Sequence, residues 1–140
     1  MLREEVLMSE RVEQRLRKAF LIGAEPQLFV SSLAASFEYY TQKLGFSIAF
    51  SYGEPPFYGQ VARDGARLNL RSVDAPVLNP ELQEHERLLS ATITLDDASA
   101  LFEEFQTAGA DFAQSLKSEP WGALTFVVRD PDGNLILFAS

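Results

Sequence analysis

The sequence contains no cysteine among its 140 residues. This excludes disulfide bridges, zinc sites built from thiolates and a cysteine nucleophile. A chain of this length has the size of one ordinary domain and can bury a core without covalent cross-links. Because disulfides are typical of oxidising compartments, their exclusion fits a reducing cytoplasm, and we expect a cytoplasmic location.

Positive charge is also scarce, because 12 Lys and Arg residues stand against 20 Asp and Glu residues, giving a net charge of −8. A negative surface disfavours nucleic-acid binding, which depends on releasing counterions from phosphates. It would attract a cationic small molecule, although ordinary solvation of the surface explains the same charge. We therefore expect a small-molecule ligand and no nucleic-acid partner.

Long hydrophobic runs are missing, since no apolar stretch approaches the roughly 20 residues of a membrane span. The first residues include Glu4 and Glu5 and contain no unbroken apolar segment. They are therefore not typical of a signal peptide. The sequence predicts no association with a membrane.

Histidine occurs once, at His85, between Glu84 and Glu86. These three residues could form a loose metal patch, but in a loop they are more typical of a solvated charged run. Asp96 and Asp97 fit a helix N-cap better than a catalytic pair of carboxylates. No serine has a base pattern nearby and no glycine-rich loop could hold a phosphate, so the residues predict no catalytic group.

Hydrophobic residues, in contrast, make up 46% of the chain and include 11 phenylalanines. Apolar residues from Leu2 to Phe20 recur at spacings of three and four, which predicts an amphipathic helix over residues 2–21 with Gly23 as its stop. We interpret residues 1–23 as an N-terminal helical extension. It would pack on the main domain, residues 24–140, or on a partner chain.

The main domain contains the same order of elements twice: strand, helix and three strands. The two modules span about residues 25–72 and 90–139, and a linker at 73–89 joins them. In the first module we expect a helix capped by Ser32 and ended by Gly45, and a hairpin at Asp64–Gly65. The strands expected there are 27–30, 46–52, 57–63 and 66–71. In the last of them Leu68 and Leu70 alternate with polar residues, as in a sheet with one buried face.

The second module repeats this order. A helix begins at Asp96 or Asp97 and ends before Gly109, and residues 130–133 form a tight turn. The strands expected are 91–95, 110–113, 124–129 and 134–139, with a loop at 115–122. One helix covers only one face of each sheet, so pairing two such sheets would form a cupped α+β structure with a ligand cavity.

Three segments of the repeat have recognisable patterns: FEYYTQKLGF at 37–46; TLDD at 94–97 with ALF at 100–102 and AG at 108–109; and PWG at 120–122 with VRDPDGNLI at 128–136. Over about residues 25–139 the chain resembles the glyoxalase / bleomycin-resistance protein / extradiol dioxygenase superfamily, also called vicinal oxygen chelate proteins. The resemblance implies two βαβββ modules that form a cupped mixed sheet. In many members the cup binds a divalent metal.

Metal-binding members take one ligand, usually His, Glu or Gln, from the first and last strands of each module. The positions that match here are Glu25 (or Gln27 on the same strand face), Asn69, Ser90 and Leu137. Leucine cannot coordinate a cation, and Asn and Ser are poor ligands for transition metals. The resemblance therefore implies a cup with no metal and no other cofactor.

The bleomycin-resistance branch is the part of the family that the chain resembles most. Its members bind a cationic, flat-ringed antibiotic between two subunits without chemistry. The resemblance implies a homodimer that sequesters a cationic or aromatic small molecule, antibiotic resistance being one use of that binding. The ligand-binding residues expected are Phe50, Tyr52, Phe57, Tyr58, Trp121, Glu38 and Asn69, with Glu54 and Glu119 as further carboxylates.

Two other functions stay open. A lyase, isomerase or dioxygenase of the same family would use Glu25 as a metal ligand or general base in the same cup. An interaction module would instead dock its N-terminal helix onto another protein. Several of the aromatic residues, Phe50 and Phe57 among them, could also belong to the core.

Overall fold

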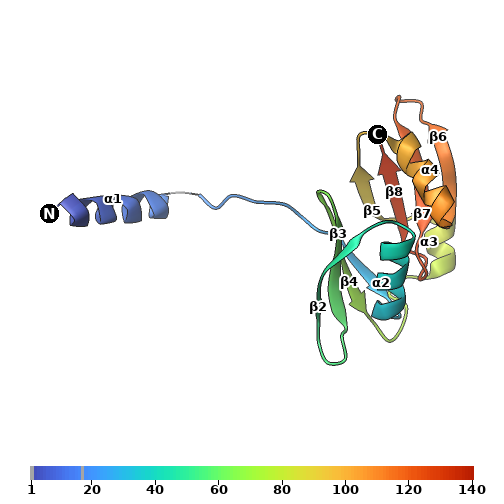
Figure 1. Ribbon diagram of the computed structural model, residues 1–140, viewed down its shortest axis with the longest axis horizontal. Coiled ribbons are helices and arrows are strands. Elements are labelled where there is room, and N and C mark those ends of the chain that lie inside the picture. The colour runs from blue at the N-terminus through green and yellow to red at the C-terminus, as the bar shows by residue number, and fades with distance from the viewer. Residues whose placement is uncertain (1, 17) are drawn as a thin grey trace.

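The computed structural model of the protein describes residues 2–16 and 18–140 (Figure 1). It confirms the expected α+β fold with two βαβββ modules. The helix α1 spans Leu2–Leu16, and Figure 1 shows it standing away from the rest of the molecule. The helix predicted over residues 2–21 is thus too long, because residues 18–26 belong to no helix or strand.

The first module contains one helix and a four-stranded sheet with the order β1-β4-β3-β2. Strand β1 runs parallel to β4, and the other neighbours are antiparallel. Its elements are β1 (Gln27–Val30), α2 (Leu33–Gln42), β2 (Ser47–Tyr52), β3 (Tyr58–Arg63) and β4 (Ala66–Ser72). Ser32 caps α2 as predicted, since its hydroxyl oxygen accepts from the Ala35 N–H.

The second module repeats this topology with the order β5-β8-β7-β6. Its elements are β5 (Leu89–Thr94), α4 (Ala98–Ala108), β6 (Phe112–Ser118), β7 (Leu124–Arg129) and β8 (Leu135–Ala139). Asp97 caps α4, and Gly109 ends it in the left-handed conformation, φ 81°. Both were predicted.

Two local predictions are wrong. The linker contains a short helix, α3 (Pro80–Glu86), whose N-cap is Asn79. The strand predicted at 110–113 lies instead at Phe112–Ser118, so residues 115–118 are strand and not loop. Strand β6 is at the edge of its sheet and its register shifts twice against β7, which breaks the alternation that a sequence pattern would show.

One hydrophobic core joins the modules. The buried face of the first sheet and the aromatic side chains of α4, β7 and β8 belong to a single cluster, which includes Tyr40, Leu70, Phe105, Phe126 and Phe138. The helices α2 and α4 each pack against their own sheet. The outer faces of both sheets point away from this core.

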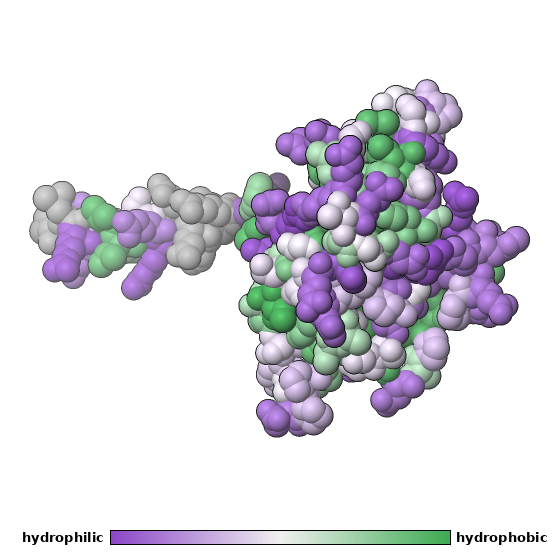
Figure 2. All heavy atoms as spheres, turned by 45° about the vertical axis from the view of Figure 1, so that its right-hand side comes forward, coloured by the Kyte–Doolittle hydropathy of each residue, from purple (hydrophilic) through white to green (hydrophobic). Residues whose placement is uncertain are grey.

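The N-terminal segment presents apolar side chains to solvent. Phe20, Leu21 and Ile22 are 86%, 90% and 96% exposed. Figure 2 shows that the surface of the domain mixes hydrophobic patches with polar side chains. Within the residues that the structure describes, no helix has the length and apolar character needed to span a membrane.

Candidate ligand-binding site

The first sheet has a core face and an outer face. Leu28, Val30, Leu68 and Leu70 are at most 1% exposed and point into the core. They alternate along β1 and β4 with polar and aromatic residues. Because successive side chains of a strand point to opposite faces, the residues between these leucines and valine form the outer face.

Cross-strand register orders that outer face into two rows. Both rows run across β1, β4, β3 and β2, with directly opposed residues side by side. The first row is Gln27, Asn69, Gln60 and Phe50, and the second is Phe29, Arg71, Tyr58 and Tyr52. We call these two rows, together with Phe57 and Arg67, the outer face of the first sheet.

Four of the five predicted aromatic ligand residues meet on this face. The rings of Phe50 and Tyr58 lie 5.8 Å apart, and those of Tyr52 and Phe57 are also 5.8 Å apart in an edge-to-face pair. Phe50, Tyr52 and Phe57 are 42%, 67% and 41% exposed. These rings are therefore paired with one another but open to a ligand, and they are not part of the core.

A chain of polar contacts runs beside the rings. Arg67 Nη1 donates to Gln60 Oε1 at 3.0 Å, and Gln60 Nε2 donates to Asn69 Oδ1 at 2.8 Å. Gln60 and Asn69 are only 8% exposed, although they lie on the outer face. Asn69 was a predicted ligand residue, whereas Gln60, which orients its amide, was not predicted.

The remaining predicted ligand residues lie elsewhere. Glu38 is exposed on α2, which packs on the opposite, core-facing side of the same sheet. Trp121 lies in the loop between β6 and β7 of the second module and is 75% exposed. Within this chain neither is brought to the outer face of the first sheet by any of its described contacts.

The family's metal positions hold few coordinating groups. Glu25 is exposed just before β1, and Asn69 is bound to Gln60. Ser90 donates to Asn134 Oδ1 at 3.1 Å and accepts from Gln83 Nε2 at 3.3 Å. In the part of the chain that the structure describes, no three His, Cys, Asp or Glu side chains cluster as a metal site would require.

Leu137 occupies the place in the second sheet that Asn69 has in the first. It lies between Thr92 and Val127, just as Asn69 lies between Gln27 and Gln60. The two outer faces therefore differ in chemistry along the equivalent row. The row of the first sheet contains three amides and the Phe50 ring, whereas the row of the second contains a threonine hydroxyl, two aliphatic side chains and the amide of Gln114.

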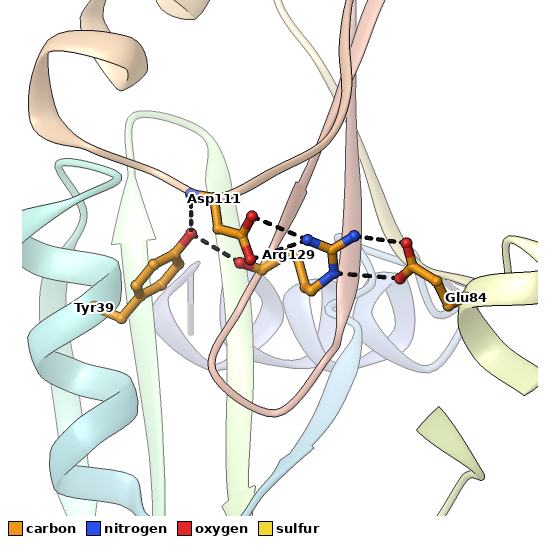
Figure 3. Close-up of polar contacts among 4 residues, drawn as sticks. All are labelled: Tyr39, Glu84, Asp111 and Arg129. Carbon is orange, nitrogen blue, oxygen red and sulfur yellow. Dashed lines mark hydrogen bonds and ion pairs between the residues drawn. The ribbon is translucent and has the colours of Figure 1, made fainter. Parts of the chain in front are cut away.

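Glu84 is exposed, as its sequence context predicts, but it also forms an ion pair. The Arg129 guanidinium binds Glu84 at 2.6 Å and Asp111 at 2.9 Å (Figure 3). The hydrogen bond from Arg129 lowers the pKa of Glu84. Beside this clamp, the Tyr39 hydroxyl donates to the Arg129 carbonyl oxygen at 2.9 Å and accepts from the Asp111 N–H at 3.3 Å. The clamp joins α3, β7 and the start of β6, and Tyr39 ties it to the first module.

Asp130 is a buried hub that the sequence presented only as a turn residue. Its Oδ2 accepts from the Tyr40 hydroxyl and from Asn134 Nδ2, both at 2.9 Å. Its Oδ1 accepts from the backbone N–H groups of Asp132 and Asn134. Burial raises the pKa of Asp130, and these hydrogen bonds partly oppose that rise. The hub is structural, since its oxygen atoms are already used.

Among the described residues, two cavities border the outer face of the first sheet, with Arg67 in the lining of one and Phe29 in the lining of the other. A cavity of about 680 Å³ lies between the modules and is lined by Arg63, Glu104 and Thr94, among others. Arg63 and Glu104 form an ion pair of 2.6 Å there. A second cavity, of about 300 Å³, is lined by the linker and by Phe29. Neither contains the exposed rings of β2 and β3.

A family model described as the Glyoxalase/Bleomycin resistance protein/Dioxygenase superfamily matches residues 23–138. The chain belongs to this superfamily. No curated protein matches it. Among solved structures of this superfamily's fold, the bleomycin-binding protein from bleomycin-producing Streptomyces verticillus, complexed with copper(II)-bleomycin, is 26% identical, with a TM-score of 0.68 over 86% of this chain and 97% of that one.

Two other superfamily structures show how widely the fold is used. A bleomycin-binding protein complexed with bleomycin is 20% identical, with a TM-score of 0.70 over 86% of this chain and 98% of that one. A glyoxalase-related enzyme from Clostridium phytofermentans is 16% identical, with a TM-score of 0.69 over 88% and 97%. At these identities the likeness shows the fold alone, so the function must be argued from the site.

Proposed function

We propose that this superfamily member binds a planar aromatic small molecule on the outer face of the first sheet, without a metal and without chemistry. The observation that carries the proposal is the set of exposed rings, Phe50, Tyr52 and Phe57, held in pairs on one sheet face. Large apolar side chains left open in one place are typical of binding surfaces. The bleomycin complex of the Streptomyces verticillus relative supports a small-molecule ligand.

Micromolar binding would require the ligand to contact a second surface besides the outer face of the first sheet. An aromatic contact contributes about 0.5–1.5 kcal/mol beyond the area that it buries. Micromolar binding needs about −8 kcal/mol in total, so a ligand lying on one open sheet face would bind too weakly. A second wall that closes over the ligand would remove water from its other side and supply the difference.

We infer that a second copy of the chain supplies this wall, as a homodimer. The strands β1 and β5 each form the edge of their sheet, and edge strands leave backbone groups free to pair. The exposed apolar side chains of Phe20, Leu21 and Ile22 also need a partner surface. Pairing two copies would close the cup and bring Trp121 and the outer face of the second sheet within the reach of the ligand.

The enzyme alternative, with Glu25 as metal ligand or general base, has less support. Of the four family positions only Glu25 carries a carboxylate, and it is exposed before the start of β1. A role in antibiotic resistance and a cytoplasmic location both stay predictions from the sequence.

The test is a calorimetric titration with 2-naphthalenemethanol, a neutral two-ring probe. We expect saturable binding that weakens by about tenfold in Tyr52→Ala, which corresponds to about 1.4 kcal/mol. Leu82→Ala, which removes an exposed apolar side chain from α3, is the matched control and should bind as the wild type does. The probe should be recovered chemically unchanged.

Equal affinities for the wild type and Tyr52→Ala would remove the outer face as the site. Turnover of a superfamily substrate that depends on added metal and is lost in Glu25→Ala would favour the enzyme instead.

A further inference from the structure

The four strands of the first sheet carry charged side chains of only one sign. Strands β1 and β2 contain no charged residue, β3 contains Arg63, and β4 contains Arg67 and Arg71. No Asp or Glu occurs in any of the four strands. In a chain with a net charge of −8, this sheet is a local exception.

Two of these three arginines remain available to a ligand. Arg63 is used inside the molecule, since it binds Glu104 at 2.6 Å and donates to the Leu44 carbonyl oxygen at 2.9 Å. Arg67 and Arg71 are exposed on the outer face. In the described part of the chain, no carboxylate lies within ion-pair distance of either one.

Neighbouring side chains hold both guanidinium groups in place. The Arg71 guanidinium lies over the Phe57 ring, 5.6 Å from its centroid. Arg67 donates through Nη1 to Gln60 Oε1 at 3.0 Å. Each group therefore uses only part of its donor set, and arginine's planar fork of N–H donors is well suited to a carboxylate, sulfonate or phosphate.

Acidic residues surround this face but do not lie in its rows. Glu25 precedes β1, Glu54 is in the turn between β2 and β3, and Asp64 is in the turn between β3 and β4. On the outer face of the second sheet, Lys117 and Glu119 pair with each other at 3.5 Å. The fixed charges among the rings of the first sheet are thus positive, whatever the net charge of the molecule.

We propose that the outer face of the first sheet selects an aromatic acid: a planar ring system that carries a carboxylate, sulfonate or phosphate group. The rings of the two rows stack on the ligand, Arg71 beside the Phe57 ring binds its anionic group, and the positive charge of Arg67 on the same strand face adds to the attraction. This inference rests on the proposed binding function and specifies its ligand class. It differs from the cationic ligand that the net charge alone would attract.

The test compares three probes that share one ring system and differ in charge: 2-naphthalenesulfonate, 2-naphthalenemethanol and 2-naphthylmethylammonium. Each is titrated calorimetrically into the full chain at low ionic strength. We expect the sulfonate to bind at least tenfold more tightly than the ammonium compound, with the alcohol between them. Added salt should reduce this preference, because it screens exposed charges.

Charge variants show whether the two arginines cause the preference. Arg67→Gln and Arg71→Gln should each reduce the ratio of sulfonate to ammonium affinity by threefold or more, while Arg71→Lys retains most of it. Arg3→Gln removes an exposed arginine from α1 and is the matched control, with the wild-type ratio. All three positions are exposed, and the unchanged thermal unfolding of each variant would confirm its fold.

The outcomes separate this inference from the proposed function. If the alcohol binds but the sulfonate binds no more tightly than the ammonium compound, the assignment of an aromatic acid is overturned and the binding function stands. A sulfonate preference that survives both Gln variants would also overturn it. If none of the three probes binds, the proposed function and this inference are both wrong.

Discussion

Tyr40 and Asp130 join the two modules through one buried hydrogen bond of 2.9 Å. Tyr40 is fully buried and Asp130 is 3% exposed. The hydroxyl donates to a carboxylate whose four hydrogen bonds also order the turn between β7 and β8. This contact is one of several that hold the second module against the first, beside the Tyr39 and Asn134 hydrogen bonds and the shared core.

Tyr40→Phe keeps the ring and removes this donor. We expect it to reduce the free energy of unfolding by about 1.5–3 kcal/mol, the usual contribution of a hydrogen bond to a charged group. Urea denaturation at neutral pH measures the loss. Tyr58→Phe, at a partly exposed site on the outer face, is the control and should change stability by less than about 0.5 kcal/mol. Equal losses in both variants would contradict the role given to the buried contact.

Some residue roles were readable from local patterns and others were not. The alternation of Leu68 and Leu70 with Arg67, Asn69 and Arg71 indicated a sheet with one buried face, and the structure confirms it. Asp130 was readable only as a turn former, because its partner Tyr40 is 90 positions away in the chain. The ion pair of Glu84 could not be predicted for the same reason, since Arg129 is 45 positions away.

At the level of elements, α2 packs closely on β3 because β3 carries a glycine under the helix. A Cβ atom at Gly59 would meet the Phe37 ring at 2.4 Å and the Phe50 carbonyl oxygen at 2.9 Å. The second contact is with backbone, which cannot move aside without disturbing the pairing of β2 with β3. The glycine therefore sets how near the helix lies to the sheet that carries the rings.

Gly59→Ala should lower stability by about 1–3 kcal/mol through overpacking, and it should weaken probe binding because β2 shifts. Thermal unfolding and a naphthalenemethanol titration measure the two effects. Gly65→Ala is the matched control, since a Cβ atom there would meet nothing within 4 Å and its φ is not left-handed. A Gly59→Ala protein as stable as Gly65→Ala would show that the helix and sheet separate more easily than the structure indicates.

Helix boundaries could be predicted where the capping residues are strong signals. Ser32, Asp97 and Gly109 begin or end helices as their residue types predict. The helix α3 was missed although Asn79 and Pro80 form a recognised start, because the prolines and charges around it suggested a loop. The apolar spacing of residues 18–22 is helical, but these residues lie outside α1. They are exposed, and a helix there would lack the packing that stabilises most helices.

At the scale of the whole molecule, the repeat determined the architecture. Two sheets with the same strand order, each covered by one helix, follow from the repeated pattern of strand, helix and three strands. The charge of the site did not follow from the charge of the molecule. Net charge sums the whole surface, whereas a ligand meets only the few side chains that the register brings together.

The account requires two copies to close the site. We expect light scattering after size-exclusion chromatography to give twice the chain mass of 15.6 kDa at micromolar concentration. Dilution should lower the apparent mass and the probe affinity together, because a separated chain offers only one open face. A protein that stays at the mass of one chain while binding the probe with micromolar affinity would contradict the dimer.

Nuclear magnetic resonance can show whether the ligand lies on the outer face of the first sheet. Uniformly nitrogen-15-labelled protein is titrated with 2-naphthalenemethanol, and the amide signals are followed. The account predicts the largest shifts at the side-chain amides of Gln60 and Asn69 and at the backbone of Phe50 and Tyr52. Shifts confined to residues around the cavity between the modules, such as Thr94, would contradict it.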